Sequence, residues 1–355
     1  MPRIALITED AYPYRASQVS SWCDELVRGL PDITFDLVAI TGTGPTRAAL
    51  VPPNTATVTT VPIWPAGMAG PVAGVPVTGA AGTDRVGGWG GPDDGASTRA
   101  ALLLCRGMFG DTDHHHDMFR SGLRELTHLA ATQPAEAAPI AGVPLAEVLA
   151  EGWATAATRQ RRPTRRSAEP RARRFTAAEA HHAAGALASA LRPLAAPPKA
   201  DLSHAVDAGL SGLVALAGKW RFGIPYLVSE HTLYTSERAT ELAHGVPAAT
   251  RVTLLRLFAA LARVVYAEAT LITAVLPAYQ RWQLSHGAAA DRLISIPIGA
   301  DPVTYHLLYE DVLAAHQPTA RRHPGRVPPP AHLVWPPRSP ALPPPRPDRF
   351  RAPAA

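Results

Sequence analysis

Hydrophobic and polar positions follow each other along the N-terminal part of the chain in the rhythm of an α/β protein. An apolar run at residues 3–7 predicts a buried first strand. Apolar residues then recur at helical spacing from Val19 to Val27, and Ser17 or Ser20 is placed to cap this helix. A second strand at 35–40 completes a strand–helix–strand unit, which is how a doubly wound α/β domain begins.

The same reasoning extends this pattern to about residue 300. We count about six strands, with a helical insertion between the third and the fourth. Thr176 and Glu179 have the spacing of a capping box, which predicts the start of a helix there. The further strands are expected at 58–64, 201–206, 225–229, 271–275 and 293–297, and the further helices at 97–108, 117–131, 144–158, 176–191, 209–220, 235–243, 250–268 and 277–285.

Two insertions and a tail interrupt the pattern. Residues 65–96 are rich in Gly, Pro and Ala and are expected to form a surface insertion, and residues 158–174 form an Arg-rich one. The last 40 residues hold 13 Pro and seven Arg without hydrophobic periodicity, so they cannot bury enough apolar area to offset the entropy of ordering. We therefore expect one Rossmann-like domain over 1–305 and a disordered Pro/Arg-rich tail over 306–355.

The charge is distributed unevenly. The chain has a net charge of +5, but residues 158–174 carry +7 and residues 316–355 carry +6, which leaves −8 for the remainder. The Arg-rich insertion has no interleaved aromatic residues, and Pro163 and Pro170 prevent one long basic helix. We expect a solvated loop there and no binding of nucleic acid.

The longest apolar stretches are too short or too interrupted for a membrane protein. Arg256 and Arg263 break the most apolar stretch, 252–266, so no membrane insertion is expected. The N-terminal apolar run is too short for a signal peptide, and we expect a cytoplasmic protein. The two cysteines, Cys23 and Cys105, are expected to be buried free thiols.

Two segments contain chemistry-bearing residues in patterns that fit known sites poorly. The segment Gly42–Ala48 begins like a dinucleotide-binding loop, but Arg47 replaces its third glycine and Pro45 removes a phosphate-binding N–H. The segment Asp111–Asp117 holds three consecutive histidines, which cannot easily converge on one metal ion. We expect a plain loop in the first case and a polar interhelical loop in the second.

A stronger signal comes from residues that follow three of the predicted strands. The carboxyl ends of parallel strands form one edge of the sheet, and ligands bind there in open α/β folds. Carboxylates, imidazoles and a guanidinium around one crevice suit a polyhydroxylated or phosphorylated ligand. The candidates are Tyr12, Tyr14 and Arg15 before the first helix, His204 on the fourth strand, and Glu230, His231, Glu237 and Arg238 after the fifth.

Three stretches together are similar to a known family, the family-4 retaining glycosyltransferases. Within this family they resemble the branch that contains the cytoplasmic glycosyltransferase of Pel exopolysaccharide synthesis, and the resemblance covers about residues 3–305 apart from the two insertions. The stretches are Glu9–Tyr14 continuing through Val19–Pro31, then Ala200–His204 leading through Lys219–Pro225 to Ser229–Arg238, and finally Ile294–Pro302.

This resemblance implies a GT-B fold, in which two Rossmann-like domains face each other across a cleft. The N-terminal domain would hold the saccharide acceptor and the C-terminal domain a nucleotide-sugar, usually a UDP-sugar, with no metal and no other cofactor. The Arg/Lys pair and Glu-x7-Glu motif of the family lie in the C-terminal domain. In this chain the resemblance implies that His231 and Glu230 are catalytic, that Tyr12, Tyr14 and His204 bind substrate, that Arg15, Ser17 and Gln18 border the donor phosphates, and that Glu237 and Arg238 orient the loop after His231.

The chain departs from the family pattern in two ways. Ser17 and Gln18 replace a Gly-Gly pair whose backbone would approach the donor, and Pro/Arg-rich sequence replaces the start of the donor-binding domain. We therefore expect the N-terminal, acceptor-side half of a glycosyltransferase, truncated or frameshifted, with weak or no activity alone. The alternative is a non-catalytic α/β domain that binds a saccharide or a partner, and in either case an exposed interdomain face would allow self-association.

Overall fold

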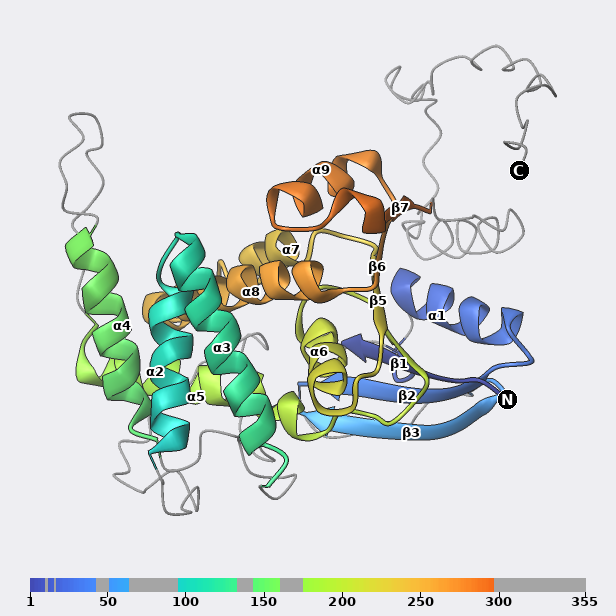
Figure 1. Ribbon diagram of the computed structural model, residues 1–355, viewed down its shortest axis with the longest axis horizontal. Helices are drawn as coiled ribbons and strands as arrows, with labels where there is room; N and C mark the ends of the chain where they lie inside the picture. The colour runs from blue at the N-terminus through green and yellow to red at the C-terminus, as the bar shows by residue number, and fades with distance from the viewer. Residues whose placement is uncertain are drawn as a thin grey trace, which may run out of the picture. The chain divides into compact units, whose positions relative to one another are not determined.

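The structure, a computed structural model, contains a parallel sheet of seven strands in the part of the chain that it describes (Figure 1). That part comprises residues 1–9, 12–15, 17–42, 51–63, 95–132, 143–159 and 175–296. The order in the sheet is β3-β2-β1-β4-β5-β6-β7. The strands are β1 (Arg3–Glu9), β2 (Thr34–Thr41), β3 (Thr55–Pro62), β4 (Leu202–Ala205), β5 (Tyr226–Glu230), β6 (Leu271–Ala274) and β7 (Leu293–Ser295).

The chain winds outward from β1 in both directions. From β1 it passes to β2 and β3 on one side, and after the helical insertion it returns to β4 beside β1 and continues to β7 on the other. In the register, Ile4 of β1 lies opposite Phe35 of β2 and Leu202 of β4. The junction between β1 and β4 is therefore the point at which the winding direction reverses, as in Rossmann-like folds.

Helices cover both faces of this sheet. Leu6 of β1 packs with Cys23 and Val27 of α1 on one face, whereas its neighbour Ile7 belongs to the larger cluster that includes residues of α6 and α8. The helices that connect or cover the strands are α1 (Gln18–Gly29), α6 (Leu210–Phe222), α7 (Tyr234–Glu241), α8 (Ala248–Glu268) and α9 (Pro277–Ser285). The alternation of Leu6 and Ile7 is the period-2 pattern expected of a buried strand.

In the described residues, four further α-helices belong to the insertion between β3 and β4 and lie beside the sheet (Figure 1). They are α2 (Ala96–Met108), α3 (Asp113–Leu129), α4 (Leu145–Arg159) and α5 (Ala177–Leu191). The helices α2 and α3 approach closely at Gly122, where an added Cβ would lie 2.5 Å from the backbone N of Leu104. Only glycine fits this contact without a shift of the backbone.

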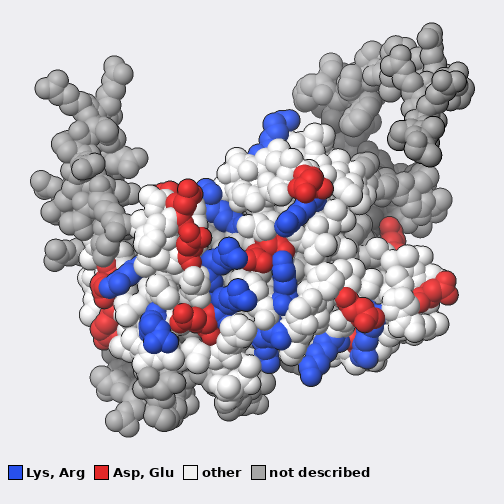
Figure 2. Space-filling model, in the orientation of Figure 1, with Lys and Arg blue, Asp and Glu red and all other residues white. Residues whose placement is uncertain are grey.

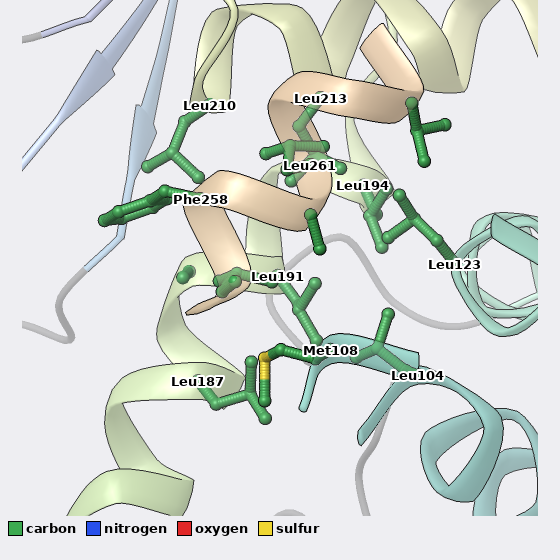
Figure 3. Packing of buried hydrophobic residues seen from close by; sticks show 14 of the residues in the cluster. Leu104, Met108, Leu123, Leu187, Leu191, Leu194, Leu210, Leu213, Phe258 and Leu261 are labelled. Carbon is green, nitrogen blue, oxygen red and sulfur yellow. The ribbon is translucent and has the colours of Figure 1, made fainter. Parts of the chain in front are cut away.

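The insertion and the sheet-covering helices share one hydrophobic core (Figure 3). In this view Met108 lies beside Leu187, and Leu123 lies beside Leu194. The core residues in this view are Leu104, Met108, Leu123, Leu187, Leu191, Leu194, Leu210, Leu213, Phe258 and Leu261, all of them buried. The insertion is therefore packed as part of the same unit as the sheet.

The structure confirms the α/β, Rossmann-like fold and the helical insertion. Seven strands are present in the described residues, where about six were expected, and each overlaps one of the seven ranges given above. The three-residue β7 at the sheet edge is the shortest. Thr176 and Glu179 form the predicted capping box at the start of α5.

One local prediction is wrong, and others fall outside the described residues. α3 begins at Asp113, so His114, His115 and His116 lie in the first turns of a helix whose N-cap is Thr112, not in a loop. The buried face formed by Phe119, Leu123 and Leu126 stabilises this helix. Nearly all of the segment Gly42–Ala48 and most of the insertions 65–96 and 158–174 lie outside the described residues, as does the whole tail 306–355.

Candidate functional site

The candidate site lies at the carboxyl edge of the sheet, where β1, β4 and β5 end side by side. Glu9 is the last residue of β1, His204 lies in β4, and Glu230 is the last residue of β5 with His231 directly after it. Because β1, β4 and β5 are adjacent in the sheet, residues far apart in sequence meet at this edge. This edge at the switch point is where open α/β sheets bind ligands.

Both site histidines contact the ring of Trp22 in α1. The Trp22 and His231 ring centroids are 4.3 Å apart, and those of Trp22 and His204 are 5.6 Å apart, both with edge-to-face geometry. Burial lowers the pKa of His231 to about 4. Burial, with a smaller effect from His231, lowers the pKa of His204 to about 3. Both imidazoles are therefore neutral at pH 7.

A chain of hydroxyl groups fixes the orientation of His204. Thr273 of β6 donates a hydrogen bond to Ser229 of β5 at 2.8 Å, and Ser229 Oγ lies 2.8 Å from His204 Nε2. Since Ser229 accepts from Thr273, its own proton is left for His204 Nε2. This arrangement favours the tautomer of His204 that carries its proton on Nδ1.

Glu230 is buried and connects three elements. Its Oε2 accepts hydrogen bonds from Tyr266 Oη of α8 at 2.7 Å and from Gln283 Nε2 of α9 at 2.8 Å. Its Oε1 has no hydrogen-bond partner of ordinary geometry in the described residues, although the backbone N–H of Tyr234 acts to lower the pKa. Burial outweighs these donors and raises the pKa of Glu230 to about 7, so the carboxyl group is close to half protonated at neutral pH.

Glu9 forms a second polar cluster at the same edge, beside the N-terminus of α6. Its Oε1 accepts from Tyr234 Oη at 3.1 Å and lies 3.8 Å from an Arg238 nitrogen, and its Oε2 accepts from the backbone N–H of Leu210 at 3.3 Å. Asp207 Oδ1 accepts from the backbone N–H of Gly209 at 2.7 Å. Two carboxylates of the chain itself thus occupy the start of α6, the place at which such helices often bind anions.

Arg238 and Glu237 hold the segment that follows His231. Arg238 pairs with Glu241 at 2.6 Å, and its guanidinium lies over the ring of Tyr234. Glu237 Oε2 accepts from Thr232 Oγ1 at 2.7 Å, which ties the loop after His231 to the start of α7. The geometry is compatible with the predicted orienting role of these two residues.

The residues between β1 and α1 differ in exposure. Tyr12 is buried, and its backbone carbonyl accepts from Thr8 Oγ1, while the Tyr14 hydroxyl bonds to Thr60 of β3. Burial and the nearby Asp24 raise the pKa of Tyr12. The three residues predicted to border the donor phosphates, Arg15, Ser17 and Gln18, are exposed.

Ser17 has a structural task that the sequence also predicted. It is the N-cap of α1, and its Oγ accepts from the backbone N–H of Ser20 at 3.0 Å. Ser20 itself donates its hydroxyl proton to the backbone carbonyl of Arg15. The start of α1 is therefore capped by groups of the chain itself.

Several residues of this edge were not among the sequence candidates. Trp22 had a local signal only as part of the apolar helix face, and Glu9 only as the start of a loop. Tyr266 and Gln283 come from helices whose sequences carry no local sign of a site. The residues that the sequence did not single out are Glu9, Trp22, Asp207, Ser229, Tyr234, Tyr266, Thr273 and Gln283.

Other features of the surface lie away from this edge. A pocket of about 690 Å³ is lined by Met1, Arg28, Thr34, Asn54 and Thr55, among others, at the amino ends of β1–β3, so it lies at the opposite edge of the sheet.

Basic side chains form a band across the face seen in Figure 2. At the C-terminal end of α8, Arg120 and Lys219 both pair with Glu268 at 3.0 Å; these cations have structural partners.

The described residues contain neither a metal-binding cluster nor a membrane-spanning helix. No group of three or more His, Cys, Asp or Glu side chains there is arranged to hold a metal ion. Within the same residues, no helix combines the length and apolar character that crossing a membrane requires.

The parallel sheet, its switch point and the polar edge define a Rossmann-like α/β protein. The family model described as "Domain of unknown function (DUF3492)" matches residues 2–84 and 161–291, more than half of the chain, and the chain belongs to this family. No curated protein matches the chain.

The two matched segments correspond closely to the parts that build the site. They include the strands β1 to β6 but not β7, and every residue that the sequence predicted for the site. They exclude α2, α3 and α4, which lie between them. The family description names no activity, so the glycosyltransferase function stays a prediction.

Proposed function

We propose that the described domain is the acceptor-side domain of a retaining, nucleotide-sugar-dependent glycosyltransferase of the GT-B type. The observation that carries this proposal is a concentration of buried polar atoms without a hydrogen-bond partner at the carboxyl edge. Among the described residues these include Glu230 Oε1, His231 Nε2, Thr235 Oγ1 and Gln283 Oε1. Unpaired buried polar atoms are costly, and their concentration beside a switch point is typical of a site that binds a ligand rich in hydroxyl groups.

The residues at this edge would have different roles. His231 and His204 are neutral imidazoles and would hydrogen-bond the sugar near the transferred group. Glu230 is only 1% exposed, so we assign it a positioning role, in which it holds α8 and α9 against β5 behind His231. Tyr12, Tyr14, Arg15, Ser17 and Gln18 would border the substrate cleft on the side of α1.

The leaving diphosphate requires a binding site that the described residues do not provide by themselves. At the starts of α1 and α6, the backbone N–H groups of Ser20, Leu210 and Gly209 already donate to Ser17, Glu9 and Asp207, and the two carboxyl groups at α6 disfavour a phosphate there. We therefore propose that a second domain, outside the described residues, binds the UDP-sugar. The described domain alone would then give no detectable transfer from UDP-glucose.

Ligand-observed saturation-transfer NMR on the full chain tests whether it contacts the sugar part of a nucleotide-sugar and not the nucleotide. With UDP-glucose, we expect saturation of the glucosyl protons, little saturation of the uridine protons, and loss of the glucosyl signal in His231→Ala. His181→Ala, on the exposed face of α5, is the matched control and should behave as wild type. Saturation mainly on uridine, or micromolar affinity for UDP, would contradict a missing donor site, and no saturation of any sugar would overturn the proposal.

The second candidate is a non-catalytic saccharide- or partner-binding domain, and exposed apolar residues favour it. Leu276, Leu284, Ile294 and Ile296 are all between 45% and 54% exposed in the segment from the end of β6 to the end of the described residues. Sequencing the coding DNA beyond codon 300 in all three frames distinguishes the candidates. A frame that continues as an α/β domain with an Arg/Lys pair and a Glu-x7-Glu motif supports the glycosyltransferase, whereas its absence in every frame favours the binding domain.

A further inference from the structure

Trp22 is placed at the site but has no role in the assignments above. It lies in the second turn of α1, partly buried against the cluster that joins α1 to β1 and β2. Its ring contacts both site histidines edge-to-face, so that α1, β4 and the loop after β5 each supply one aromatic ring. The fold thus brings Trp22 together with two histidines that lie more than 180 residues away from it in sequence.

Each of these rings has a nitrogen that bonds to no group of the described chain. Trp22 Nε1, His204 Nδ1 and His231 Nδ1 have no hydrogen-bond partner in the described part of the chain, and Trp22 is only partly buried. Trp22 can only donate, and the hydroxyl chain from Thr273 favours a proton on His204 Nδ1. Two donors, Trp22 Nε1 and His204 Nδ1, therefore belong to one cluster of aromatic rings.

The charge at this place selects the kind of ligand. Both imidazoles are neutral at pH 7 because burial lowers the pKa of each to about 4 or below. The guanidinium of Arg238 is held by Glu241 and Tyr234. An uncharged ring with hydroxyl groups on its edge and an apolar face matches such a surface better than a phosphate group does.

We propose that Trp22, His204 and His231 form one subsite that binds the pyranose ring of the acceptor saccharide. The inference rests on the proposed function, which it deepens by naming the residues and the uncharged part of the substrate. The ring would lie against the aromatic cluster, and its hydroxyl oxygens would accept from Trp22 Nε1 and His204 Nδ1.

The test measures binding of methyl α-D-glucopyranoside to the full chain by saturation-transfer NMR at millimolar concentrations. Trp22→Phe keeps an aromatic ring but removes the N–H, and we expect it to weaken binding about threefold or more; Trp22→Ala should weaken it about tenfold or more. Trp282→Phe is the matched control, because Trp282 also contacts a histidine, His286, at 3.9 Å but lies in α9; it should bind as wild type.

A purely structural role of Trp22 would give a different result. If Trp22 only holds His231 in place, binding is lost only in variants that no longer bury the His231 ring. NMR titration detects this loss of burial as a rise of the His231 pKa from about 4 toward 6.5. We expect Trp22→Phe to leave that pKa near 4 while it weakens sugar binding. Equal binding by wild type and Trp22→Phe, or displacement of the sugar by inorganic phosphate, would overturn the subsite.

The outcomes separate the subsite from the proposed function. If the sugar binds wild type and the Trp22 variants equally, but binding is lost in His231→Ala, the subsite fails and the proposed function stands. If the sugar depends on Trp22 but no reading frame continues as a donor-binding domain, the subsite stands on the non-catalytic candidate. If wild type binds no sugar, both fail.

Discussion

The helical insertion buries mainly apolar side chains, whereas the carboxyl edge of the sheet buries several polar ones. In the insertion, buried side chains are almost all apolar, and the close approach of α2 and α3 at Gly122 leaves no spare volume. At the carboxyl edge, Glu230, His204, Ser229 and Thr273 are buried polar groups, and several nearby polar atoms have no partner. One region is optimised for stability, whereas the other tolerates costly burial, as is common at binding sites.

The largest effect is expected in the insertion. Leu123 is fully buried and points toward Leu194 in the shared core (Figure 3). Leu123→Ala should lower the free energy of unfolding by about 2–5 kcal/mol, because it leaves a cavity. Urea denaturation measures the loss. Leu284→Ala on α9 is the control, since Leu284 is 45% exposed, and it should change the free energy of unfolding by less than about 0.5 kcal/mol. Equal losses in Leu123→Ala and Leu284→Ala would contradict the tight packing of the insertion.

A comparable effect, but dependent on pH, is expected at Glu230. An unfolded glutamate ionises near its ordinary pKa of 4.5, whereas Glu230 in the folded chain has a pKa of about 7. The stability that this group contributes is fully present below pH 4.5 and is lost as the pH rises to about 7, by roughly 3 kcal/mol. Glu230→Gln, which keeps the acceptor for Tyr266, should remove that loss.

The measurement is the difference in unfolding free energy between wild type and Glu230→Gln at pH 4.5 and pH 8. We expect the variant to gain relative to wild type at pH 8 only. His204 and His231 act in the opposite direction, since their lowered pKa values cost stability as the pH falls below 6.5, but they are present in both proteins and cancel in the difference. If this difference in unfolding free energy does not change with pH, the pKa of Glu230 is not raised in the folded chain.

A smaller effect is expected where α2 and α3 touch. Gly122→Ala would place a Cβ 2.5 Å from Leu104 N and 2.6 Å from Ala100 O, and the backbone shift should cost about 1–3 kcal/mol. Gly185→Ala is the matched control, because nothing lies within 4 Å of its added Cβ in α5. It should raise stability by about 0.5–1 kcal/mol in the same thermal or urea denaturation. Destabilisation by both would mean that the contact at Gly122 is not specific.

The same contrast explains what the sequence could predict. In the described residues, periodicity placed each strand and each α-helix approximately, apart from the first turn of α3, because a buried face imposes a local pattern. Topology then brought His204, Glu230 and His231 to one edge. Gln283 reaches Glu230 across 53 positions and Tyr266 across 36, and no local pattern encodes such a contact. Trp22 fitted the apolar face of α1, so its second contact with the histidines could be found only in three dimensions.

The smallest effect concerns Ser17, which belongs to the edge by position but has the local task of a helix cap. Ser17→Ala should lower stability by about 1 kcal/mol, because the N–H of Ser20 loses its acceptor. Ser17→Asp keeps an acceptor and adds a negative charge at the helix start, so it should restore that stability. Ser21→Ala, at an exposed position of the same helix, controls for the loss of a hydroxyl.

Saccharide binding then tells whether the cap is all that Ser17 does. If methyl α-D-glucopyranoside binds wild type, Ser17→Ala and Ser17→Asp equally, the residue acts on the helix and not on the sugar. If Ser17→Asp is as stable as wild type but loses the sugar, the start of α1 belongs to the ligand surface. The division between capped helix starts and the aromatic subsite would then have to be redrawn, with the subsite extended from Trp22 toward the first turn of α1.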